Sequence, residues 1–154
     1  MSDRSAIGAS SPEGVALIAG VAIVYLAVRL LPRWIAAGSA RWSPRDLHRR
    51  LAGGTPPLLL DVRAAIEVAE TGTIPGSINV PMSRLSTWLS AGAEALDKRR
   101  PVVTLCRSDT RAAFAARRLR REGFRSTALL VGGIEAWAQE GLPLHHPKDR
   151  HIGS

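Results

Sequence analysis

A short apolar segment that changes abruptly into a helical pattern constrains the fold of this chain more than any other feature. Residues 102–105 are apolar or β-branched, a pattern that favours a buried strand. Polar residues follow at 107–110, and residues 112–119 then place alanines and a leucine on one face of a helix. Because strand-to-helix units build parallel sheets, we expect an α/β fold with helices on both faces of the sheet.

Cys106, the only cysteine of the chain, lies at this junction between strand and helix. Open α/β sheets bind ligands at the carboxyl ends of their strands. The backbone N–H groups of residues 107–110 and the helix N-terminus would favour a thiolate, which is the nucleophilic form of cysteine. Arg107 and Arg111 would add fixed positive charge. We therefore predict an activated cysteine, and the alternative is an inert cysteine that fills space in the core.

The composition limits the other kinds of site. A single cysteine excludes an intramolecular disulfide and a cysteine-rich zinc site. The four histidines lack the spacing of metal ligands, so we expect neither a metal nor another cofactor. A net charge of +8 favours an anionic partner. We expect no nucleic-acid partner, because the few aromatic residues are not interleaved with the basic ones.

The N-terminal region predicts a membrane anchor. After a polar tail over residues 1–12, residues 15–31 form a run of 17 with Arg29 as its only charge. At 1.5 Å per residue this run would span about 26 Å. We expect a transmembrane helix over residues 13–31, which would be the contact with the membrane. One alternative is a cleaved signal peptide, and the sequence does not decide whether the helix is retained. A buried core helix is the other alternative, and it is disfavoured because the stretch is apolar all round and precedes a complete domain.

The charges around this helix predict its orientation. Six arginines lie between residues 29 and 50, whereas Arg4 is the only basic residue on the N-terminal side. The positive-inside rule then predicts a single-pass membrane protein with its catalytic domain in the cytoplasm, where a lone cysteine would stay reduced. We expect a linker over residues 32–42, a domain over 43–144 and a C-terminal tail over 145–154.

Strand and helix signals alternate through the expected domain. Further strands are expected at residues 58–62, 78–80 and 126–131. Ser43 and Asp46 have the spacing of a helix N-cap with its capping box. The other expected helices cover residues 63–69, 83–89, 112–122 and 132–140, with a further helical turn over 93–98.

Several motifs in this region together resemble the rhodanese family. The segments that carry the resemblance are residues 60–63, Glu67, 72–81, 106–111, 123–124, 132–137 and 141–143. The resemblance covers residues 43–144 and implies a five-stranded parallel sheet flanked by helices. It also implies a cysteine that carries sulfane sulfur as a persulfide. Thr73 stands where the family usually has histidine, and Val68 stands where an aromatic residue is common.

The resemblance implies a sulfurtransferase enzyme. Cys106 would take sulfur from a small anionic donor such as thiosulfate and pass it to a thiol or to cyanide, which is covalent catalysis in two half-reactions. Asp61 and Arg63 could support the loop, with Asp61 as a carboxylate partner of Arg111. The alternative, an ion pair that only shapes the fold, is the more common case near functional sites. The expected substrate-binding residues are Arg107, Ser108, Asp109, Thr110 and Arg111.

Other functions remain open at this point. The domain could be a persulfide relay that serves a partner protein as sulfur acceptor without turning over small molecules. A cysteine phosphatase or arsenate reductase ranks lower, because the loop has one residue fewer between Cys106 and Arg111 than cysteine phosphatases have. Asp109 would also repel a phosphate dianion. The arginines within residues 117–125 are interpreted as a solvated helix face, with contact to anionic lipid as the alternative.

Overall fold

Five parallel strands form the sheet that the strand–helix alternation predicts. A computed structural model describes residues 12–35, 38–92 and 96–147. The strands are β1 (Ala40–Trp42), β2 (Leu58–Asp61), β3 (Ile78–Asn79), β4 (Val102–Leu105) and β5 (Thr127–Leu130). Their order is β1-β5-β4-β2-β3, and every neighbouring pair is parallel. Asp61 pairs with Leu105, so β2 and β4 end level with one another just before Cys106.

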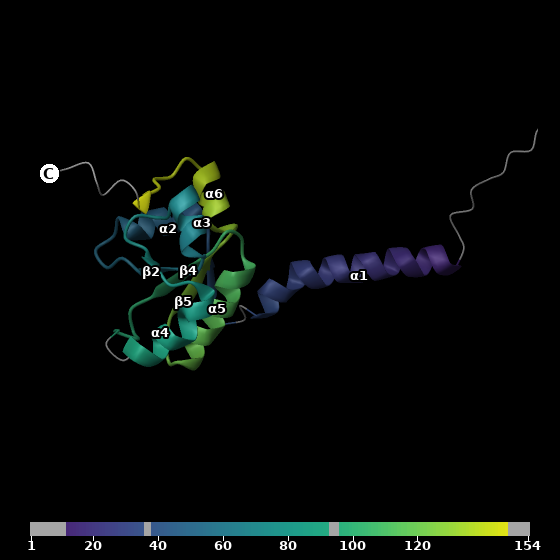
Figure 1. The fold of residues 1–154 in the computed structure, drawn as a ribbon, viewed down its shortest axis with the longest axis horizontal. Coiled ribbons are helices and arrows are strands. Elements are labelled where there is room, and N and C mark those ends of the chain that lie inside the picture. Colours follow the sequence, from purple (N-terminus) through teal and green to yellow (C-terminus); the bar gives the residue numbers. More distant parts are fainter. Residues whose placement is uncertain (1–11, 36–37, 93–95, 148–154) are drawn as a thin grey trace, which may run out of the picture.

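Helices cover the sheet on both faces (Figure 1). The helices are α2 (Pro44–Leu51), α3 (Ala65–Thr71), α4 (Leu85–Gly92), α5 (Thr110–Arg121) and α6 (Gly133–Gln139), with a 3-10 turn η1 over Met82–Arg84. One core cluster contains residues of α4 and α5, and the other contains residues of α2 and α6. The predicted N-cap is confirmed, because the Ser43 hydroxyl accepts a hydrogen bond from the N–H of Asp46 at 3.2 Å.

Strand β1 lies in the region that the sequence predicts to be a linker, residues 32–42. It has three residues, pairs only with β5, and leaves Ala40 and Arg41 exposed. A three-residue edge strand has too few side chains to show an alternating pattern, so hydropathy alone cannot identify it. The first residues of the predicted linker, 32–35, are also not a linker, because helix α1 continues to Ile35.

Helix α1 (Pro12–Ile35) projects away from the domain and meets it at α5 (Figure 1). Its described apolar side chains, among them Leu17 and Ile18, are exposed. Most of the predicted N-terminal tail, residues 1–11, lies outside the described residues, and so do residues 148–154 of the predicted C-terminal tail.

The expected transmembrane helix over residues 13–31 is contradicted. In the part of the chain that the structure describes, no helix combines the length and the apolar character that crossing a bilayer requires. A run of 17 residues is at the lower limit of the length that a hydrocarbon core of about 30 Å requires. The expected single-pass location with a cytoplasmic catalytic domain depended on that helix and is therefore wrong.

Candidate active site

Cys106 follows β4 directly and begins a loop that lies against the start of α6. Its carbonyl oxygen accepts a hydrogen bond from the N–H of Ile134 at 2.9 Å. The Asp109 carboxylate accepts a hydrogen bond from the N–H of Gly132 at 2.7 Å and one from the Arg41 guanidinium at 2.8 Å. The first turn of α6 and its N-cap residue thus hold both ends of the loop in place.

The close approach of these two segments requires glycine at residue 133. Gly133 has a φ of 62°, and a Cβ atom there would lie 2.4 Å from the carbonyl oxygen of Cys106. That distance is too short for a carbon beside a backbone oxygen, so a side chain would push the loop away from α6. The glycine repeat before α6, which the sequence shows as part of the family resemblance, therefore has a steric cause.

Replacing Gly133 by alanine should lower the free energy of unfolding by about 2–4 kcal/mol, because left-handed strain and overpacking add together. Gly141 provides the matched control: it has a φ of 66° and nothing within 4 Å of its ideal Cβ position. Gly141→Ala should therefore show the strain alone, about 1–2 kcal/mol. Urea unfolding of both variants measures the difference, and equal losses would mean that the contact between the loop and α6 is absent.

The Cys106 side chain is closed off from solvent, with 1 % of its surface exposed. Burial raises the pKa of the thiol, and backbone hydrogen bonds from Ala112 and Ser108 and the charge of Arg111 oppose that rise without cancelling it. The Ser108 carbonyl oxygen also accepts a hydrogen bond from the thiol. In this closed loop the raised pKa favours the thiol over the thiolate, contrary to the expectation from the local features alone.

The raised pKa of Cys106 makes a prediction for its reaction with iodoacetamide. Alkylation should be slow at neutral pH and should rise with a midpoint above about 8.5, the ordinary cysteine pKa. The same chain unfolded in urea is the matched control, because its single cysteine is then exposed and unperturbed. A midpoint in the folded chain below that of the unfolded chain would contradict the closed, protonated state.

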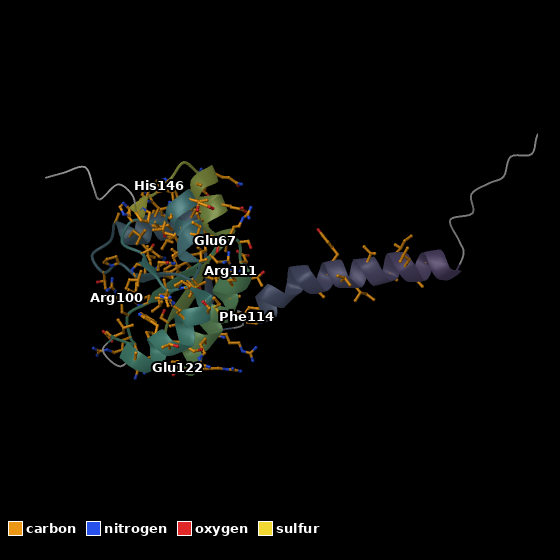
Figure 2. All side chains as sticks on the ribbon, in the orientation of Figure 1. Glu67, Arg100, Arg111, Phe114, Glu122 and His146 are labelled. Atoms are coloured by element: carbon orange, nitrogen blue, oxygen red, sulfur yellow. The ribbon has the colours of Figure 1, made fainter. Side chains whose placement is uncertain are left out.

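The carboxylate partner of Arg111 is Glu67 of α3. The expected partner was Asp61, and that expectation is wrong. Both terminal nitrogens of Arg111 donate to the Glu67 carboxylate at 2.7 Å, and Figure 2 shows the two side chains close together. Glu67 also accepts a hydrogen bond from the N–H of Ala64 at 2.9 Å. These contacts lower the pKa of Glu67 to about 2, and the hydrogen bonds from Arg111 have the largest effect. The sequence contains a signal for this pair, since Glu67 is part of the family motif.

Asp61 and Arg63 form a buried ion pair beneath α3, with 0 % and 2 % of their surfaces exposed. Arg63 contacts both carboxylate oxygens of Asp61, and it also donates to the carbonyl of Gly72 at 2.7 Å. The hydroxyl of Thr73, the residue that replaces the usual histidine, donates to Asp61 at 2.7 Å. The pair therefore links the end of β2 to the end of α3. It makes no direct contact with Arg111, which Glu67 binds.

The remaining loop residues face outward or start the next helix. Arg107 is exposed and donates to Glu135 of α6 at 2.6 Å. Ser108 is exposed, and Thr110 is the first residue of α5. The structure thus brings the predicted residues 106–111 together in one loop. It adds four partners that were not among the predicted site residues: Arg41, Glu67, Gly132 and Glu135. Glu67, Gly132 and Glu135 lie in segments that carry the family resemblance, but the sequence does not show which loop residue each of them contacts. No local pattern indicates Arg41.

A cavity of about 340 Å³ adjoins the loop between α3 and α6. Its lining residues are Arg63, Glu67, Glu70, Thr71, Arg107, Ile134, Glu135 and Ala138. A larger cavity, about 460 Å³, touches Leu59 and Arg100 at the opposite, amino-terminal end of the strands. Within the described residues, no three His, Cys, Asp or Glu side chains lie together as potential metal ligands. The smaller cavity reaches the loop through Arg107, whereas Cys106 itself is not among its lining residues.

Comparisons with known proteins agree with this arrangement. Residues 43–140 match the family model described as a rhodanese-like domain. A sulfurtransferase of Allochromatium vinosum is 37% identical over 103 residues, which cover 67% of this chain and 92% of that protein. The adenylyltransferase and sulfurtransferase MOCS3 of rice (Oryza sativa subsp. japonica) is 35% identical over 114 residues, but the chain spans only 25% of its length.

A solved structure extends the comparison to three dimensions. The polysulfide-sulfur transferase homodimer of Wolinella succinogenes has 27% sequence identity to this chain and a TM-score of 0.66. The match covers 84% of this chain and 94% of that one. The likeness therefore extends over most of both chains.

Proposed function

The chain belongs to the rhodanese-like family of sulfurtransferase domains, and we propose that it moves sulfane sulfur by way of a persulfide on Cys106. The observation that carries this proposal is the position of its single cysteine at the end of β4, in a loop that carboxylates hold from two sides. Glu67 holds Arg111, and Glu135 holds Arg107. Such a loop can present backbone N–H groups to a bound sulfur atom.

In the first half-reaction, the Cys106 thiolate attacks the outer sulfur of a donor. A new S–S bond forms on Cys106, and the S–S bond of the donor breaks, so the donor leaves as a thiolate or as sulfite. In the second half-reaction, an acceptor thiolate or cyanide attacks the terminal sulfur, and Cys106 leaves as a thiolate. Arg111 supplies positive charge near the sulfur in both steps, since its charge already lowers the pKa of the thiol.

The closed loop requires a movement before the first step. The thiol must lose its proton and turn away from the Ser108 carbonyl, whose partial negative charge would repel a thiolate. The salt bridge between Arg107 and Glu135 is exposed and therefore weak, so it can open at little cost. The salt bridge between Arg111 and Glu67 is bidentate, and it holds the far end of the loop while the near end moves.

Steady-state kinetics test this two-step scheme. With thiosulfate or a small persulfide as donor and cyanide or a thiol as acceptor, initial rates should give parallel double-reciprocal lines, because each substrate leaves before the next reacts. Intersecting lines would require donor and acceptor to be bound together, and the persulfide scheme would then be wrong.

A persulfide relay is the second candidate, and the closure of Cys106 favours it. A thiol with 1 % exposure is protected from small reagents until a partner opens the loop. The rice relative carries its matching segment as about a quarter of a longer protein, which is consistent with a domain that serves another domain. Efficient loading from a donor, combined with slow release to cyanide and to small thiols, would distinguish the relay from a turnover enzyme.

A further inference from the structure

The arginines around the loop carry no uncompensated positive charge. Each of four arginines at or near the loop has a carboxylate partner among the described residues. The pairs are Arg41 with Asp109, Arg63 with Asp61, Arg107 with Glu135, and Arg111 with Glu67. The expectation that Arg107 would attract an anionic donor assumed a free guanidinium. In the structure Glu135 neutralises it at a distance of 2.6 Å.

One carboxylate of the adjoining cavity has no such partner. Glu70 lies in the last turn of α3, is exposed, and lines the 340 Å³ cavity together with Arg107 and Glu135. Among the residues that the structure describes, no basic side chain lies within ion-pair distance of Glu70. The cavity and the salt bridges around it therefore retain one unmatched negative charge.

The positive charge of the chain is located elsewhere. Arg117, Arg121 and Arg125 are exposed on α5 and just beyond it, and no ion-pair partner of theirs lies within the described residues. The net charge of +8 therefore says little about the substrate of the loop. A small substrate in the cavity experiences the nearest charges most strongly, because salt screens the distant ones beyond about 8–10 Å.

We propose that this cavity selects sulfur donors and acceptors that carry an ammonium group, in other words aminothiols and their persulfides, over anionic ones such as thiosulfate. Glu70 is the residue that determines this specificity. The inference rests on the proposed sulfur transfer and specifies its substrate class. The Cys106 thiolate takes the outer sulfur of the aminothiol persulfide, and the donor leaves as the aminothiolate, so no oxidant or reductant is required.

A series of three persulfides of nearly equal length tests the preference. They are the persulfides of cysteamine, 2-mercaptoethanol and 3-mercaptopropionate, which end in an ammonium, a hydroxyl and a carboxylate. Intact-mass spectrometry of the full chain gives the rate at which each adds one sulfur atom to Cys106. The ammonium compound should load fastest and the carboxylate slowest, with about a tenfold spread at low salt that shrinks at 1 M salt.

Two variants assign the preference to Glu70. Glu70→Gln should reduce the ratio of ammonium to carboxylate loading rates by about three- to fivefold. Glu122→Gln makes the same charge change on the far side of the domain, as Figure 2 shows by the separation of Glu122 from Glu67, and it should leave the ratio unchanged. Equal rates for the three compounds, or equal ratios in the two variants, would overturn the substrate class alone. No loading by any compound would instead overturn the sulfur-transfer proposal.

Discussion

Replacing Cys106 by serine should abolish persulfide formation and turnover while the fold persists. A serine hydroxyl is a poor nucleophile at neutral pH and cannot hold a sulfane sulfur. The substitution hardly changes the volume of the side chain, and the hydroxyl can donate to the Ser108 carbonyl as the thiol does. We expect a loss of about 1 kcal/mol in the free energy of unfolding, because a hydroxyl costs more to bury than a thiol.

Turnover assays and circular dichroism of the same preparation measure the two effects of Cys106→Ser. Ser86→Ala is a useful control, since it alters an exposed serine of α4, outside the loop that carries Cys106. That control should retain loading of Cys106. Sulfur transfer by the serine variant above the uncatalysed rate would show that another group carries the sulfur.

Removing one partner of the buried pair between Asp61 and Arg63 should produce the largest loss of stability. Arg63→Met leaves the Asp61 carboxylate buried with only the Thr73 hydroxyl and the N–H of Arg63's own position as donors. An unpaired buried charge of this kind costs about 3–5 kcal/mol. Urea unfolding at neutral pH measures this loss.

A salt bridge at the surface gives the comparison for this prediction. Asp97 and Arg99 form an exposed salt bridge, with half or more of each side chain open to solvent. Asp97→Ala should change the free energy of unfolding only slightly, because water and salt screen an exposed pair. If Arg63→Met cost no more than Asp97→Ala, the Asp61–Arg63 pair would not be part of the structural core.

The sequence predicts most of the sheet because three of its strands are largely apolar runs followed by helical patterns. Residues 59–61, 102–105 and 127–130 are buried, and burial on both sides of the sheet leaves a nearly continuous apolar signal. β1 escapes detection because only Trp42 of its three residues is partly buried. Its place in the sheet depends on pairing with β5, which is a contact between distant segments.

The part of the candidate site that is contiguous in the sequence can be predicted from the sequence. Residues 106–111 form one continuous loop, so the sequence alone brings them together. The partner of Arg111 could not be predicted in this way, because two carboxylates, Asp61 and Glu67, both lie near the end of the sheet that carries Cys106. Asp61 is already engaged by Arg63 and Thr73, which leaves Glu67 to bind Arg111. That competition between carboxylates is settled by three-dimensional geometry.

The protonation state of Cys106 is also beyond the reach of the sequence. The local features that favour a thiolate are present, namely nearby backbone N–H groups and Arg111. Their effect is smaller than that of burial, which raises the pKa of the thiol. Burial depends on how α5, the loop and the start of α6 close around the sulfur, and a motif read along the chain does not contain that information.

The most direct test of the central claim is to find the sulfur atom on Cys106. The full chain would be treated with a persulfide donor, freed of excess reagent, alkylated and analysed by mass spectrometry of the intact protein and of the peptide that contains Cys106. Since the chain has one cysteine, no other thiol can confuse the assignment. We predict a gain of one sulfur atom on that peptide, which disappears after addition of a thiol acceptor. An unmodified Cys106 under conditions in which sulfur is still transferred to the acceptor would contradict the account.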